Sequence, residues 1–194
     1  MTKTSRKLVL IFFFVTGGPP ASFCGAQAQP NQLDDHIALR LVVDDWVTNA
    51  ETHVMRVADA MPEDKYSFAP AGAGFKGVRT FAQQLKHLAA NNYYQAAIML
   101  AQEPPEGTKG EVGPDSVKSK AEVMMYVKGS FESLHRAVAT VDEKNVEHPI
   151  PGTSGTWQRS SVGRTVDAVA HSFNHYGQLV EYLRMNNIVP PDSR

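Results

Sequence analysis

The sequence contains a single cysteine, Cys24, among its 194 residues. We expect the N-terminal segment that holds Cys24 to be removed during export, which leaves a mature chain without a thiol. Such a chain has no disulfide framework and no cysteine to serve as a nucleophile or a metal ligand. A lipid anchor on Cys24 is disfavoured, because Phe23 stands where a lipidated cysteine normally follows a small residue.

Neither sign of charge dominates, since 20 Asp and Glu residues balance 19 Lys and Arg residues to give a net charge of −1. Three of the basic residues, Lys3, Arg6 and Lys7, lie in the expected leader, so the mature chain carries a net charge of −4. Nucleic acids and anionic surfaces are bound by clusters of Lys and Arg. We therefore expect no nucleic acid among the partners.

A long hydrophobic run is also missing. The strongest run, LVLIFFFV at residues 8–15, follows the three basic residues and is too short to span a bilayer. The Ala-Gln-Ala sequence at 26–28 fits a signal-peptidase site. We expect a signal peptide at 1–28, a mature domain at 29–194 and a periplasmic or secreted protein without a membrane anchor. The alternative, an uncleaved anchor, conflicts with the Gly-Gly-Pro-Pro break at 17–20.

The mature sequence gives no convincing strand pattern. Apolar residues instead recur at helical spacing in four segments, separated by loops rich in glycine and proline. The predicted fold class is all-α: a four-helix bundle, up-down with long loops. The expected helices cover residues 33–61, 80–101, 119–141 and 166–187.

Two helix starts have a specific signal. The sequences Thr80-Phe81-Ala82-Gln83 and Ser119-Lys120-Ala121-Glu122 each fit a capping box, in which side chains at both ends satisfy backbone amides. The buried stripe of the first helix is expected to include Trp46. That of the last is expected to include Val166, Val169 and Phe173.

His171 and His175 stand four residues apart, which places both rings on one face of the last helix. Neutral imidazoles at this spacing can share a metal ion such as zinc, nickel, copper or iron. The residues between them include no glutamate, so a zincin protease is not supported. Two ligands make a weak site. His87, beside the apolar stripe of the second helix, would supply a third nitrogen and leave a fourth position open. His53 is either a further ligand or pocket residue, or a packed, hydrogen-bonded side chain.

Four sequence blocks stand out: Phe81…His87-Leu88, Asn91-Asn92-Tyr93-Tyr94, Ser119-Lys120-Ala121-Glu122 and His171-x-x-x-His175-Tyr176-Gly177-Gln178. Together they resemble the DinB/YfiT-like superfamily over nearly the whole mature chain. The resemblance implies a four-helix bundle, often a homodimer, with a divalent metal ion, zinc or nickel, on His87, His171 and His175. The sequence departs from the family at Asn174, where many relatives have a second histidine, and at Asn187, where glycine is common.

The sequence leaves two functions open. One is an exported metal-dependent enzyme, hydrolase-like or transferase-like, that acts on a small-molecule substrate. The other is a non-catalytic bundle that is stabilised by its metal ion and binds a ligand or partner. The sequence identifies no general base, so the catalytic residues are unknown. Asn91 and Gln178 either orient the ligands and contact substrate, or form hydrogen bonds between helices.

Overall fold

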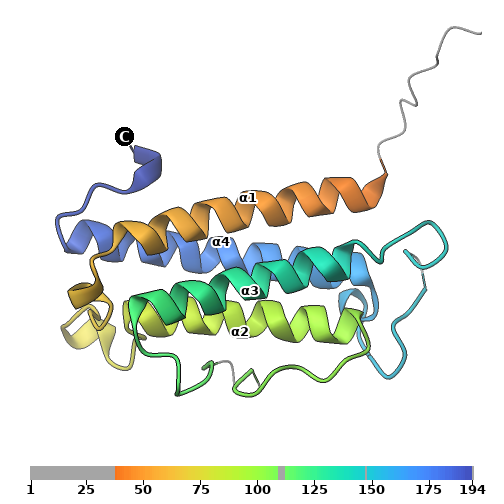
Figure 1. Ribbon diagram of the computed structural model, residues 1–194, viewed down its shortest axis with the longest axis horizontal. Helices are drawn as coiled ribbons and strands as arrows, with labels where there is room; N and C mark the ends of the chain where they lie inside the picture. Colours follow the sequence, from red (N-terminus) through yellow and green to blue (C-terminus); the bar gives the residue numbers. More distant parts are fainter. Residues whose placement is uncertain (1–37, 109–111, 147, 194) are drawn as a thin grey trace, which may run out of the picture. The chain divides into compact units, whose positions relative to one another are not determined.

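The computed structural model describes residues 38–108, 112–146 and 148–193. The expected signal peptide, and Cys24 with it, therefore lies outside the described residues. The described chain forms four long helices and no strand (Figure 1), which confirms the all-α fold. Within the same residues, no helix has the length and apolar character needed to cross a membrane. The elements in order are α1 (Leu39–Ala60), η1 (Glu63–Lys65), η2 (Ala73–Phe75), α2 (Phe81–Met99), α3 (Lys120–Val138), η3 (Trp157–Arg159), α4 (Ser161–Met185) and η4 (Pro191–Ser193).

The helix directions depart from strict alternation. α2 and α3 lie side by side and run the same way, because the chain between them returns along the bundle before α3 begins (Figure 1). The expected up-down order is therefore interrupted at this connection. α4 runs antiparallel to α2, so that Gln84 near the start of α2 meets Gln178, and Gln95 near its end meets Asp167. This antiparallel pair holds the polar residues described below.

The helix ends follow local chemistry. Thr80 caps α2 and Ser119 caps α3, each in a complete capping box as predicted. α4 begins at Ser161, more than a turn before the expected start, because the Ser160 side chain accepts a hydrogen bond from the Gly163 amide. The early start brings Arg164 into the helix.

The apolar core lies between all four helices, but two expected core residues are not in it. Trp46 is 55% exposed and Val166 is 56% exposed. Val169 and Phe173 only border the core. The buried residues of α4 are small or polar as far as His175 and larger, Leu179, Tyr182 and Leu183, toward its end. The largest fully buried side chains are Phe81, Phe131, Met61, Leu85, Leu88, Leu134, Leu179 and Leu183.

Candidate metal centre

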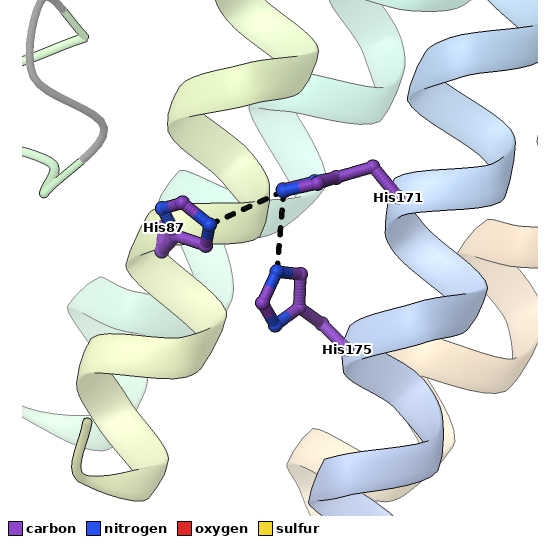
Figure 2. Close-up of side chains that lie close together, drawn as sticks. All are labelled: His87, His171 and His175. Atoms are coloured by element: carbon purple, nitrogen blue, oxygen red, sulfur yellow. Dashed lines mark hydrogen bonds between the residues drawn. The ribbon is translucent and has the colours of Figure 1, made fainter. Parts of the chain in front are cut away.

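Three histidine rings converge between α2 and α4. His87 projects from α2, and His171 and His175 project from successive turns of α4 toward it (Figure 2). The Nε2 atom of His171 lies 3.2 Å from Nε2 of His87 and 3.1 Å from Nε2 of His175. His87 and His175 are each 5% exposed, whereas His171 is half-buried. The three side chains thus present their ring nitrogens to one point.

Hydrogen bonding alone accounts poorly for this arrangement. A neutral imidazole nitrogen carries either one proton or one in-plane lone pair. Nε2 of His171 faces two other Nε2 atoms at once, so it cannot donate its single proton to both, nor accept well from both. A cation between the rings would satisfy all three nitrogens together. Each residue of the trio offers one ligand atom, and these atoms all lie within 4.8 Å of one another.

The electrostatics of His175 favour the neutral form that metals bind. Burial of the ring lowers the pKa of His175 to about 3, with further contributions from His171, His87 and Arg79. The ring is therefore neutral across the physiological range and need not lose a proton before it coordinates an ion.

The spacing fits a first-row divalent metal. Zinc–imidazole bonds of about 2.0–2.1 Å place ligating nitrogens of a tetrahedral site roughly 3–4 Å apart. The two measured separations of 3.2 Å and 3.1 Å fall in this range. Three neutral ligands leave the full charge on the ion and one position for another molecule. Imidazole suits zinc, nickel, copper and iron, so the donor set does not identify the metal.

His53 lies outside this trio. Its Nδ1 atom is 2.6 Å from Oδ2 of Asp192, and the centre of its ring lies 5.2 Å from that of Tyr176, with the two rings tilted by 51°. The hydroxyl of Tyr176 also donates to Asp192, at 2.6 Å. The structure therefore places His53 in a contact between α1 and the C-terminal segment. Of the two sequence interpretations, this matches the packed, hydrogen-bonded side chain.

Asn91 and Gln178 lie on either side of the trio along the helices. Gln178 accepts a hydrogen bond of 2.7 Å from Nε2 of Gln84, which joins α4 to α2. Asn91 is 6% exposed, and its side-chain oxygen accepts from Nε2 of Gln95 at 3.3 Å. Both residues thus belong to the polar interface between α2 and α4, the role in helix contacts that the sequence left open for them.

Four further residues of this interface were missed by the sequence analysis. Gln84, Gln95, Asp167 and Arg164 extend the trio into a polar stripe on the facing sides of α2 and α4. A signal was present, because Gln84, His87, Asn91 and Gln95 recur at helical spacing, with polar residues where the other faces are apolar.

Comparison with known proteins identifies the family of this chain and supports its fold. The sequence model described as the DinB superfamily matches residues 48–179. The chain belongs to the DinB superfamily. A crystal structure titled as a conserved protein from Enterococcus faecalis has the same fold, with a TM-score of 0.60 at 13% identity over 77% of this chain and 97% of that one. No curated protein matches the chain.

Proposed function

We propose that His87, His171 and His175 hold one divalent metal ion, zinc or nickel, and that this DinB protein is a metal-dependent enzyme acting on a small molecule. The convergence of the three Nε2 atoms carries the proposal. A bound divalent ion would act there as a Lewis acid toward water, a thiol or a carbonyl group. The protein's own part is to keep three neutral ligands in place between two rigid helices.

Metal analysis of single variants tests the ligand set. We expect about one equivalent of zinc or nickel per chain in the purified wild-type protein, and loss of most of it in His87→Ala, because two imidazoles make a weak site. His171→Ala and His175→Ala should behave the same way. His148→Ala, which alters an exposed histidine in the loop before α4, is the control and should keep its metal. Full occupancy in His87→Ala would refute the assignment of the third ligand.

A second function has one observation in its favour. Two of the three rings are only 5% exposed, as expected of an ion that stabilises the fold rather than one that meets substrate. Chelation separates the two functions. Removal of an ion needed only for catalysis should lower the melting temperature by no more than its binding free energy explains and leave a cooperative unfolding transition, because the bundle has its own apolar core. Removal of a structural ion should abolish that cooperative transition. A parallel screen of the zinc- and nickel-loaded protein against ester, amide and thiol-transfer substrates should give activity that His87→Ala lacks.

Export and a homodimeric state are further parts of this proposal. The export signal rests on the sequence of residues 1–28, and N-terminal mass spectrometry of protein from cell fractions should find a chain that begins near Gln29. Intact Met1 on a cytoplasmic protein would exclude export.

The homodimer is supported by an exposed apolar groove of about 230 Å³ beside Trp46 and Val166. Light scattering of the wild type and of Trp46→Glu checks it.

A further inference from the structure

Arg164 is a buried cation in the same interface as the three histidines. It lies in the first turn of α4, seven residues before His171 and on the same helix face. Seven residues correspond to about 10 Å along the helix axis. The residue is only 5% exposed. Arginine is almost never this buried unless its charge is balanced by a partner.

The charge of Arg164 is not balanced by a direct ion pair. Nη1 donates to the side-chain oxygen of Gln95 at 2.8 Å, a neutral acceptor. In the part of the chain that the structure describes, the buried Nε has no hydrogen-bond partner and no carboxylate lies within ion-pair distance of the guanidinium. The nearest acidic group in the stripe, Asp167, instead accepts a hydrogen bond of 2.8 Å from Nε2 of Gln95. Burial lowers the pKa of Arg164, the electrostatic influence of Tyr94 and Asp167 opposes this shift, and the guanidinium stays charged.

A second observation points to what balances this charge. Arg164 lines a pocket of about 550 Å³ between the C-terminal end of α2 and the loop that precedes α4. Figure 1 shows this loop beside the end of the bundle where α2 ends and α4 begins. The pocket wall is apolar at Ile98 and Ile150, and it carries the hydroxyl group of Ser154. The Thr153 hydroxyl donates to the Ile150 carbonyl and so serves the loop itself. A buried cation, an apolar wall and a hydroxyl donor together suit an organic anion better than a bare inorganic one.

We infer that this pocket binds the carboxylate group of a small organic acid, with Arg164 as its counter-charge. Gln95 fixes one edge of the guanidinium and leaves other N–H groups for the ligand. A molecule held at Arg164 would begin about 10 Å from His171 along α4. The residues that line the pocket include none of the three histidines, so the carboxylate site is separate from the proposed metal centre.

Benzoate and its neutral analogue benzamide test the inference on the zinc-loaded mature protein. The readout is the methyl NMR signals of Ile98 and Ile150, which report on the pocket wall itself. We expect benzoate to shift both signals saturably and benzamide to do so at least about tenfold more weakly, because charge-assisted hydrogen bonds dominate. Arg164→Met should weaken benzoate binding by about tenfold or more. Arg159→Met, which removes an exposed charge from the same loop, is the matched control and should bind like the wild type.

Two further variants keep the result decisive. Ile98→Trp fills the pocket and leaves Arg164 in place, so it should abolish the benzoate shift at Ile150 even if Arg164→Met folds poorly. His87→Ala should lose metal and still bind benzoate, which separates failure of the metal proposal from failure of this one. Equal binding of benzoate and benzamide would overturn the inference. So would benzoate binding that survives Arg164→Met and disappears in His87→Ala, because the anion would then sit on the metal.

Discussion

The Nε2 atoms of His171 and His175 lie 3.1 Å apart on successive turns of α4. Two imidazoles at this distance cannot both carry a positive charge in a buried site without strong repulsion. Burial of His175, together with its histidine neighbours, accordingly lowers its pKa to about 3. In the unfolded chain the same ring titrates near the ordinary value of about 6.5.

This difference predicts how the metal-free protein responds to acid. Between about pH 6.5 and pH 3 the unfolded chain binds a proton at His175 that the folded chain does not, so stability falls as pH falls. The slope reaches about 1.4 kcal/mol per pH unit, or about 2 kcal/mol between about pH 7 and pH 5. Chelator-treated wild-type protein should therefore lose about this much more free energy of unfolding than His175→Asn does over that interval, as measured by urea denaturation. Identical losses in the two proteins would contradict the buried, neutral His175.

A second prediction concerns the acceptor for the other nitrogen of His175. When Nε2 binds a metal, Nδ1 carries a proton and is normally held by an acceptor. Nδ1 of His175 and the side-chain oxygen of Gln84 are both buried without a hydrogen-bond partner among the described residues. Gln84 lies one turn before His87 and contacts Gln178, one turn after His175. We expect a shift of the Gln84 side chain to pair these two atoms when the metal binds.

Gln84→Leu should therefore weaken zinc binding by about tenfold while all three ligands remain. Competition with a chromophoric chelator measures the dissociation constant. Gln95→Leu is the control on the same face of α2, because its partners are Asp167, Arg164 and Asn91. If Gln84→Leu and the wild type bind zinc equally, Gln84 takes no part in holding His175.

The sequence carried most of the local structure and little of the helix arrangement. Thr80 and Ser119 form the predicted capping boxes, because a cap depends only on residues within one turn. Trp46 was wrongly expected in the core. Periodicity identifies an apolar face but does not say whether another helix covers it, and here α1 leaves Trp46 55% exposed.

The candidate site shows the same division. The pairing of His171 with His175 follows from helix geometry alone. The proximity of His87 could be predicted only from the packing of facing helices in a bundle or from the family resemblance. His53 could not be placed, because its partner Asp192 lies 139 residues away in the sequence. Arg164 was missed because the sequence analysis did not identify Ser160 as the N-cap of α4. With Ser160 as the cap, the helix begins at Ser161 and includes Arg164.

A third prediction concerns the contact between α3 and α1. Nδ1 of His135 is 2.6 Å from Oδ1 of Asp44, and its Nε2 is 3.2 Å from Oε2 of Glu51. A protonated ring can donate to both carboxylates and so join the two helices. His135→Ala should lower the free energy of unfolding by about 1 kcal/mol, the upper range for partly exposed ion pairs, and high salt should reduce the difference. Metal content should not change. A loss of metal in His135→Ala would mean that this contact sets the position of the histidine trio.

The last prediction concerns the C-terminal segment. Asp192 accepts hydrogen bonds from the Tyr176 hydroxyl and from Arg56, and it contacts His53 at 2.6 Å, so one carboxylate fastens η4 to α1 and α4. The bond from Tyr176, followed by the contacts with His53 and Arg56, holds the pKa of Asp192 below its usual range. A lowered carboxyl pKa gives stability that is present above the ordinary value of about 4 and is lost as pH falls through the folded value.

Asp192→Asn keeps the shape of the side chain and removes its charge, so it should release the segment at neutral pH. Carboxypeptidase should then trim the C-terminus of the variant several times faster than that of the wild type, because digestion follows the population of the open form. Asp64→Asn, which alters an exposed carboxylate in η1, is the control and should be trimmed like the wild type. Lowering the pH should speed trimming of the wild type toward the rate of Asp192→Asn and leave that variant little changed. Equal trimming rates at neutral pH would show that packing of the segment, rather than the Asp192 carboxylate, fastens it to the bundle.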